Sequence, residues 1–208
     1  IGDSADKLIE NITPKINNIK VGPYNDETSD MGPVVSKDAY ERINGLIDSG
    51  VEEGANLIVD RRNIKLQGYE NGYFIGPCLF DNVKDNMKIY KEEIFGPVLS
   101  IVRAKNYEEG LQLVKDNPYG NGCSIFTRDG DTARNFSSEA NIGMVGVNIP
   151  IPVPVAYFSF GGWKNSIFGG HNAYGMEAIR FYTHTKTITS KWPEGIRSGA
   201  QFTMPTLG

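Results

Sequence analysis

The middle of the chain alternates short apolar runs with longer amphipathic stretches. Residues 98–102, 123–127 and 143–148 are predicted to be strands, and the stretches that begin at Asn106 and Asp131 carry apolar residues at helical spacing. Strands separated by helices of this length are joined by parallel crossovers, which need an open sheet covered on both faces. The alternation therefore predicts an α/β fold with an open, mainly parallel sheet flanked by helices.

A first helix is expected close to the start of the chain. Ser4 can cap it, because a serine hydroxyl accepts a hydrogen bond from the first helical turn. Its apolar face would carry Leu8, Ile9 and Ile12. Pro14 is expected to disturb this helix, since proline lacks a backbone donor.

A second helix is expected after Ser36, which again can serve as the cap. It places Ile43, Ile47 and Val51 at four-residue steps, so that the three share one face. Residues 57–59 form a short strand-like apolar run after it. These elements would supply another layer of the same α/β fold.

The composition argues against several classes of partner. The 25 acidic and 21 basic residues give a formal net charge of −4, and no basic block could follow a phosphate backbone, so no nucleic acid partner is expected. No apolar stretch reaches the ~20 residues that cross a bilayer, so no membrane partner is expected either. Cys78 and Cys123 support neither a disulfide framework nor a zinc cluster. We therefore expect a soluble, intracellular protein without a metal site.

The segment with the most chemical information runs from Glu92 to Val98 and reads Glu-Glu-Ile-Phe-Gly-Pro-Val. Pro97 favours extended backbone before it, and in extended backbone Glu93 and Phe95 face the same side. The carboxylate could accept two hydrogen bonds from a ribose diol while the ring packs on an adjoining nicotinamide. Residue types alone also allow a helix-end glutamate and a core phenylalanine. The pair is a candidate nucleotide-binding site with a structural alternative.

A second informative run, from Asn148 to Gly162, contains three alternating prolines. Each proline fixes φ and removes a backbone donor, so the run is expected to be a stiff extended loop and not a central strand. Such a loop can shape a pocket. A plain connection between the sheet and the tail is the alternative.

The Glu92 to Val98 segment closely resembles the signature of the aldehyde dehydrogenase superfamily. The resemblance covers almost the whole chain in order, through Met-Gly-Pro at 31–33, Gly-Tyr-Phe-Ile-Gly-Pro at 72–77, Phe-Thr-Arg-Asp at 126–129 and Phe-Tyr-Thr-His-Thr-Lys-Thr-Ile-Thr at 181–189. It implies that Glu93 holds the nicotinamide ribose of NAD and that Phe95 supports the ring. It also implies that residues 1–182 are part of the catalytic domain and that residues 183–208 are an oligomerisation strand and C-terminal tail.

Within this superfamily, the proline run is similar to that of the methylmalonate-semialdehyde dehydrogenases that acylate coenzyme A, where Asn-x-Pro-Ile-Pro-Val-Pro leads into Phe-Ser-Phe. The resemblance implies that the run borders the aldehyde channel through Pro150, Ile151, Pro152, Phe158 and Phe160. Many hydrolytic members continue Gly-Gly-x-Lys-x-Ser with Gly-x-Gly-Arg-Glu, and residues 161–171 depart from that pattern. The departure argues against a hydrolytic enzyme and leaves His171 as an expected surface histidine.

The implied chemistry begins when a cysteine thiolate attacks the aldehyde, after which hydride passes to NAD and leaves a thioester. Loss of carbon dioxide and transfer to coenzyme A then give propionyl-CoA or acetyl-CoA, as in valine catabolism. The nucleophile of that branch lies in Gly-Gln-x-Cys, a context that neither Cys78 nor Cys123 has. We therefore expect the catalytic cysteine upstream of Ile1, no catalytic residue in this chain, and no dehydrogenase activity from the chain alone.

The ends of the chain carry two further expectations. No Met precedes Ile1 and a helical pattern starts almost at once, so we expect a carboxy-terminal fragment. From Thr183 to Ser190 the alternating residue types favour a strand with one polar face. The resemblance implies that this strand joins a neighbouring subunit of a homo-oligomer, and an ordinary edge strand is the alternative. The implied compartment is the bacterial cytoplasm or the mitochondrial matrix.

Three other functions remain open from the sequence. The chain could belong to a hydrolytic NAD(P)-dependent aldehyde dehydrogenase, act as a noncatalytic interaction or oligomerisation fragment, or be an α/β nucleotide-binding protein outside this superfamily. No Gly-x-Gly-x-x-Gly or Walker arrangement occurs in a strand-to-helix setting. A nucleotide-binding crossover is therefore expected upstream of this chain.

Overall fold

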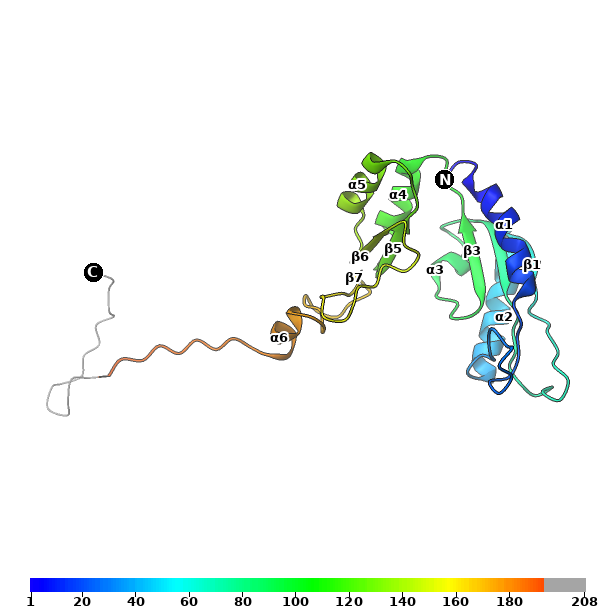
Figure 1. Cartoon of the computed structure of the whole chain (residues 1–208), viewed down its shortest axis with the longest axis horizontal. Helices are drawn as coiled ribbons and strands as arrows, with labels where there is room; N and C mark the ends of the chain where they lie inside the picture. Colours follow the sequence, from blue (N-terminus) through cyan, green and yellow to red (C-terminus); the bar gives the residue numbers. More distant parts are fainter. Residues whose placement is uncertain (193–208) are drawn as a thin grey trace.

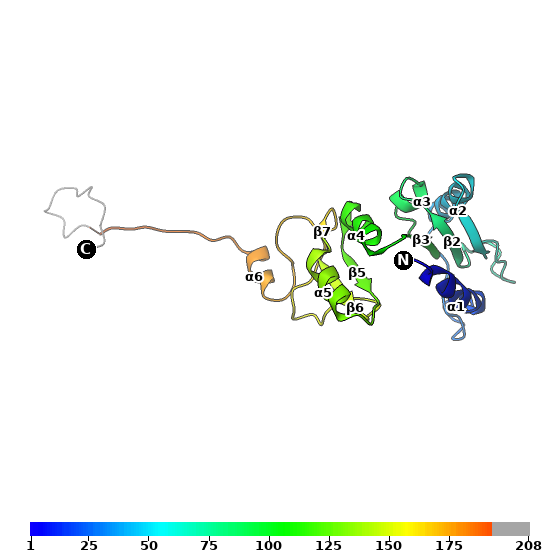
Figure 2. The same cartoon turned by 90° about the horizontal axis from the view of Figure 1, so that it is seen from above.

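The computed structural model describes residues 1–192, which form two lobes and an extended end (Figures 1 and 2). The elements of the first lobe are α1 (Ser4–Asn18), α2 (Lys37–Glu52), β1 (Asn56–Asp60), β2 (Cys78–Val83), α3 (Lys88–Lys91) and β3 (Val98–Val102). Those of the second lobe are α4 (Tyr107–Asp116), β4 (Tyr119–Gly120), β5 (Gly122–Ile125), α5 (Gly130–Glu139), β6 (Met144–Val147) and β7 (Trp163–Lys164). A short helix, α6 (Glu177–Tyr182), precedes the extended end.

The strands form three small sheets of mixed direction. β2 pairs antiparallel with β1 and parallel with β3, β5 and β6 are parallel, and β4 and β7 are antiparallel. The α/β fold with an open sheet and flanking helices is confirmed, but the sheets are mixed and not mainly parallel. The reason lies in the connections. No helix separates β1 from β2, so the chain returns antiparallel, whereas α3 and α5 carry it back to parallel partners.

β2 is the central strand of the first lobe and is covered by a helix on each face. Phe80 and Cys78 pack with buried residues of α2, including Ile43 and Ile47. Leu79, which points to the opposite face, packs with buried residues of α1. Figure 2 shows α1 and α2 on opposite sides of this sheet.

α1 departs from its predicted form in two ways. Ser4 is the first residue inside the helix and Asp3 is the N-cap, without a side-chain hydrogen bond, so the predicted cap is wrong. The helix also continues through Pro14 to Asn18. Both Pro14 and Glu10, whose carbonyl loses its donor, lie on the solvent side, where water can replace the missing hydrogen bond.

α2 begins as predicted, since Ser36 Oγ accepts a hydrogen bond from the Ala39 amide at 3.1 Å. Its buried stripe is shorter than predicted. Val51, in the last turn, is 46% exposed, and Leu8 of α1 is 49% exposed. Apolar residues at helical spacing therefore mark the buried faces correctly, but the stripe does not reach every residue in register.

Arg103 joins α1 to the sheet through ion pairs with the exposed Asp6 and the buried Asp81. Among residues 1–192, Asp81 of β2 is the one buried charged side chain, at 4% exposed. Arg103 donates to both of its carboxylate oxygens, at 2.9 and 2.8 Å, and also to Asp6 of α1 at 2.7 Å. The hydrogen-bonded guanidinium lowers the pKa of Asp81. α1 is thus held by charge as well as by apolar packing.

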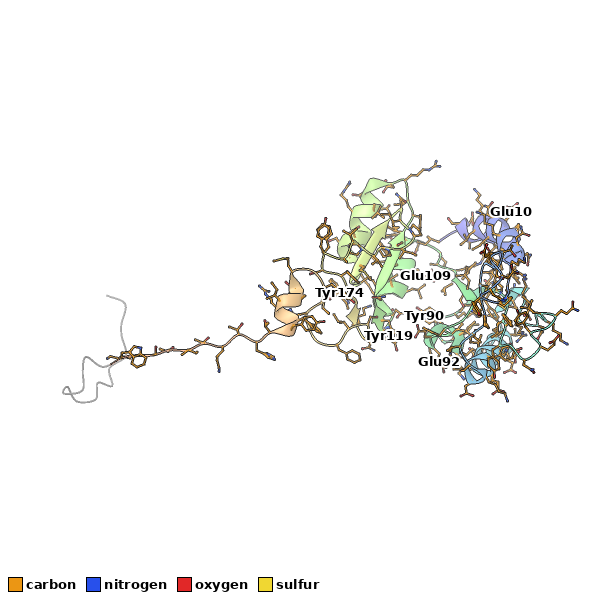
Figure 3. All side chains as sticks on the ribbon, turned by 60° about the horizontal axis from the view of Figure 1, so that its bottom comes forward. Glu10, Tyr90, Glu92, Glu109, Tyr119 and Tyr174 are labelled. Atoms are coloured by element: carbon orange, nitrogen blue, oxygen red, sulfur yellow. The ribbon has the colours of Figure 1, made fainter. Side chains whose placement is uncertain are left out.

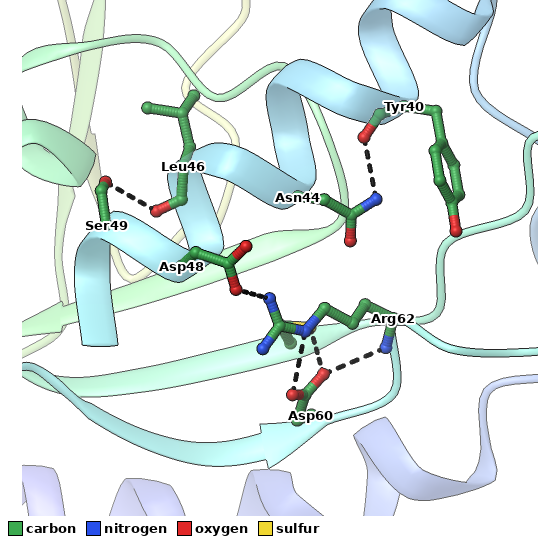
Figure 4. A network of polar contacts seen from close by, with 8 residues as sticks. Tyr40, Asn44, Leu46, Asp48, Ser49, Asp60 and Arg62 are labelled. Carbon is green, nitrogen blue, oxygen red and sulfur yellow. Dashed lines mark hydrogen bonds and ion pairs between the residues drawn. The ribbon is translucent and has the colours of Figure 1, made fainter. Parts of the chain in front are cut away.

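A second polar network fastens α2 to β1 (Figure 4). Arg62 forms ion pairs with Asp48 of α2 and with Asp60 of β1, the latter at 3.0 Å. The side chains of Asn44 and Ser49 donate to carbonyls within α2 itself. These contacts fix α2, which in turn supports the loop between α3 and β3.

The second lobe has the predicted alternation of strands and helices. Asn106 caps α4 by accepting from the Glu109 amide at 2.9 Å, and Asp129 caps α5 in the same way. Leu111 of α4 and Phe136 of α5 lie together in one buried cluster against β5 and β6. The strands and helices predicted for this part of the chain are therefore confirmed.

The last part of the described chain has little regular structure. Residues 148–162 form the irregular loop predicted for the proline run. Residues 183–190 are exposed, run away from the lobes and form no strand within the single chain (Figure 1). The predicted strand is therefore not observed in residues 183–190 of the single chain. Residues 193–208 of the predicted tail lie outside the described residues. No helix in residues 1–192 is long and apolar enough to cross a membrane.

Candidate functional site

The loop between α3 and β3 presents Glu93 and Phe95 to the outside. Ile94 between them is buried in the first-lobe core, while Glu93 is exposed and Phe95 is 75% exposed. The predicted extended backbone is not uniform, because Phe95 has a left-handed φ of 51°. That conformation costs a non-glycine residue about 1 kcal/mol. Core packing does not explain an exposed ring on strained backbone, and such residues concentrate at ligand sites.

Two contacts hold this loop against α2. Arg42 donates from Nη1 to the carbonyl of Glu93 at 3.1 Å and from Nη2 to the carbonyl of Ile94 at 2.8 Å. Gly96 lies so close to Ile43 that a Cβ atom there would be 2.7 Å from Ile43 Cδ1. The loop is therefore positioned before any ligand binds, which lowers the cost of binding.

Glu93 lines a cavity of about 540 Å³ where the two lobes meet. The residues that surround it are Tyr90, Lys91, Glu92 and Glu93 from the first lobe and Asn117, Tyr119, Asn121, Asn165 and Ser166 from the second. Figure 3 places Tyr90 and Glu92 beside Tyr119 at this junction. The lining combines carboxylate, amide and phenol groups, which suits a polar ligand rich in hydroxyl and amide groups. Phe95 does not line this cavity, so only Glu93 of the predicted pair reaches it.

Lys164 of β7 stabilises the second-lobe wall of this cavity, which is the side formed by Asn117, Tyr119, Asn121, Asn165 and Ser166. Its ammonium donates to the carbonyls of Val114, Lys115 and Asn117 at 3.1, 2.9 and 2.8 Å. These carbonyls lie at the C-terminal end of α4, where no helical donor remains for them. The wall is thus fixed by a charged helix cap.

The proline loop lies on the second lobe and does not border the Glu93 cavity. The residues predicted to border an aldehyde channel are Pro150, Ile151, Pro152, Phe158 and Phe160. Most of them are exposed, but Pro152 packs against the glycines of β5 and β6, and Phe160 stacks on Tyr174 with ring centroids 4.7 Å apart. The chain returns to the cavity wall only at Asn165 and Ser166. In this chain alone, the proline loop and Glu93 therefore border separate spaces.

The other reactive side chains lie outside this cavity. Cys78 is buried in β2 and Cys123 is half-buried in β5, and both are free thiols. Burial raises the pKa of each thiol, which disfavours the nucleophilic thiolate. His171 Nδ1 lies 3.2 Å from Glu177 Oε2 at the half-exposed surface near α6.

The chain belongs to the aldehyde dehydrogenase family, whose family model matches residues 2–188. It is 52% identical to malonate-semialdehyde dehydrogenase of Pseudomonas aeruginosa over 100% of this chain and 42% of that protein. It is 47% identical to the human mitochondrial acylating methylmalonate-semialdehyde/malonate-semialdehyde dehydrogenase over 98% of this chain and 38% of that protein. The chain thus spans less than half the length of these curated relatives.

Solved structures with the same fold agree with these relatives. A Sinorhizobium meliloti structure assigned as a methylmalonate-semialdehyde dehydrogenase, in complex with NAD, is 61% identical with a TM-score of 0.88 and covers 95% of this chain and 40% of its own. The methylmalonate-semialdehyde dehydrogenase of Oceanimonas doudoroffii is 48% identical with a TM-score of 0.87, covering 94% and 40%. Both neighbours share the α/β fold of this chain.

Sequence reasoning missed Arg42 and Lys164. Arg42 shows no local signal, because its partners lie 51 and 52 residues further along the chain. Lys164 stands in the segment Gly-Gly-Trp-Lys-Asn-Ser at 161–166, which served only to argue against hydrolytic relatives and gave the lysine no role. The available signal was a lysine two positions after a pair of glycines.

Proposed function

We propose that this chain is the part of an NAD-dependent, coenzyme A-acylating methylmalonate- or malonate-semialdehyde dehydrogenase that carries the nicotinamide-binding loop. The full-length enzyme would form propionyl-CoA or acetyl-CoA, carbon dioxide and NADH. Identity of 47% to a human enzyme named for both semialdehydes supports this substrate class. The neighbour at 61% identity was solved with NAD, which supports the cofactor.

The observation that carries the proposal is the exposure of Glu93 and Phe95 on a loop that is already fixed. Glu93 is exposed and lines a cavity with room for a ribose, and a carboxylate can accept hydrogen bonds from hydroxyl donors. The strained, exposed Phe95 ring, two residues along the same loop and outside the lining of this cavity, offers a flat apolar surface. These groups fit the nicotinamide riboside half of NAD, which when bound accepts the hydride from the substrate. Glu93 would orient the ribose, and Phe95 would limit the positions of the ring.

Acyl transfer to coenzyme A requires that water be kept from the thioester. The proline loop presents the exposed apolar side chains Ile151 and Phe158, which would complete a dry aldehyde channel with the rest of the enzyme, together with Pro150, Pro152 and Phe160. A hydrolytic enzyme would instead admit water. NADH formation that proceeds equally fast without coenzyme A would favour the hydrolytic alternative.

The catalytic cysteine is assigned to the part of the enzyme outside this chain. Because both cysteines here sit in surroundings that disfavour a thiolate, the purified chain should not reduce NAD with methylmalonate semialdehyde. The measurement is the absorbance of NADH. Turnover by the chain alone would refute this assignment.

The assay for the loop uses a full-length dehydrogenase in which this chain forms the segment that it matches in the relatives. Glu93→Gln removes the charge but keeps the shape, so hydride transfer should slow by roughly tenfold or more, while folding is retained. Phe95→Ala should weaken NAD binding with a stability change within about 0.5 kcal/mol, because its ring is already exposed. Unchanged turnover in the Glu93 variant would remove the ribose contact. Tight NAD binding that neither substitution weakens would favour a nucleotide-binding protein of another kind.

Residues 1–182 are assigned to the catalytic domain and residues 183–208 to an oligomerisation strand and tail. Support comes from the exposed, irregular backbone of residues 183–190 and from the exposed apolar side chains of Ile188 and Trp192. The assembly would be a homo-oligomer. Named relatives occur in bacteria and in mitochondria, which supports the bacterial cytoplasm or the mitochondrial matrix as the compartment.

A further inference from the structure

Lys164 makes more directed contacts than a helix cap needs. A lysine ammonium has three hydrogens, and here each can meet one carbonyl, those of Val114, Lys115 and Asn117, at 3.1 Å or less. Its positive charge also lies at the end of α4 where the helix dipole is negative. The backbone of Lys164 has a left-handed φ of 52°, a conformation that is strained for a non-glycine residue.

Residues 164–166 also hold the second-lobe wall of the Glu93 cavity together. Lys164 pairs with Tyr119 across β7 and β4, and the next residue, Asn165, donates its amide to the carbonyl of Pro118 at 3.1 Å. Ser166 Oγ accepts from the Gly120 amide at 3.1 Å. The residues beside these contacts, Asn117 and Asn165 among them, are the ones that face the cavity. Lys164 therefore pins both strands of the wall to one helix end.

We infer that Lys164 is a positioning residue, whose ammonium holds the amide-bearing wall at a fixed distance from Glu93 and so sets the width of the cavity for the nicotinamide riboside. The inference rests on the proposed function, since it assigns NAD to this cavity. Lys164 itself does not line the cavity. Its effect is exerted through Asn117 and Asn165.

Lys115 provides a matched control on the same helix. Its side chain lies in the last turn of α4, as a cap would, but it pairs with Glu139 of α5 at 2.7 Å. Removing its charge perturbs the helix end and one ion pair without touching the β4 and β7 wall. A purely structural role of charge at this helix end would make the two lysines equivalent.

The test measures NAD dissociation constants by equilibrium titration, together with thermal unfolding, for variants of the full-length dehydrogenase that contains this chain. Lys164→Met should weaken NAD binding by about tenfold, whereas Lys115→Met should change it by no more than about twofold. Lys164→Arg keeps the charge and several donors and should recover part of the affinity. In the double variant Glu93→Gln/Lys164→Met, the two losses should be less than additive, because both act on one cavity.

The outcomes separate this inference from the proposed function. If Glu93→Gln weakens NAD binding and Lys164→Met does not, the positioning role is overturned and the NAD site stands. If Glu93→Gln has no effect, the proposed function fails instead. Equal losses in Lys164→Met and Lys115→Met, in proportion to lost stability, would also overturn the positioning role. Should Lys164→Met fail to fold, Lys164→Gln keeps one donor group and must still bind NAD more weakly than Lys115→Met does.

Discussion

Arg42 binds the backbone of the loop that carries Glu93. The arginine lies on the exposed side of α2, and its two hydrogen bonds reach the backbone of the loop and no side chain. Its role is therefore independent of which side chains the loop carries. This arrangement separates the residue that positions the loop from the residues that would contact the nucleotide.

Arg42→Met should weaken NAD binding by the full-length enzyme several-fold while costing about 1 kcal/mol of stability, because one of the two lost hydrogen bonds is exposed and the other is only part-buried. Lys37→Met on the same helix is the control. Its ion pair with Glu41, at 3.4 Å, is highly exposed and contributes little. Equal NAD affinity in the Arg42 and Lys37 variants would show that the two hydrogen bonds of Arg42 do not position the loop.

At this scale the sequence predicted residue types better than it predicted contacts. Glu93 and Phe95 were identifiable because a carboxylate and a ring two residues apart suit a nucleotide, although buried Ile94 and not strand alternation turns them outward. Arg42 and Lys164 were not identifiable, since a contact between residues about 50 positions apart depends on the fold. Positioning residues leave weaker local patterns than contacting residues do.

At the scale of elements, Arg103 joins α1 to β2 because it pairs with Asp6 of α1 as well as with Asp81 of β2. Asp81→Asn should cost roughly 2–3 kcal/mol at neutral pH, because Arg103 loses a charged partner in a mostly buried place. Urea unfolding measures this loss. Asp131→Asn is the control, since its pair with Arg134 is exposed and should change stability by less than about 0.5 kcal/mol.

The same pair predicts a pH dependence of stability. The pKa of Asp81 is lower in the folded chain than its ordinary value, so its carboxylate contributes stability above that ordinary value. The contribution is lost as the pH falls through the ordinary pKa towards the lowered one. Asp81→Asn should therefore flatten the acid side of the stability curve. An equally steep acid loss in the variant would mean that other carboxylates control it.

Capping residues and apolar spacing predicted most elements correctly. Ser36 and Asn106 begin α2 and α4 as expected, because an N-cap hydroxyl or amide is a local signal. Pro14 was misleading, since the cost of a missing donor depends on whether water can reach the freed carbonyl. The mainly parallel sheet was predicted from the helix-linked strands of the middle of the chain, and the antiparallel pair of β1 and β2 lies outside that pattern because no helix separates the two strands.

At the scale of the whole molecule, the extended end is exposed in the single chain, and we propose that it contacts a neighbouring subunit. A variant truncated after Tyr182 removes the exposed segment, so a full-length enzyme carrying it should form smaller assemblies than the intact protein. Light scattering after size-exclusion chromatography measures this change. An unchanged mass would place the subunit contact elsewhere, and a stable assembly formed by the isolated chain would favour an interaction fragment.

The central claim is that Glu93 binds the nicotinamide ribose. A crystal structure of the full-length enzyme with NAD tests it most directly. We predict both ribose hydroxyls within hydrogen-bond distance of the Glu93 carboxylate, with the Phe95 ring against the nicotinamide and Arg42 still bound to the loop backbone. A complex in which the Glu93 side chain faces solvent, and other groups hold that ribose, would contradict the assignment.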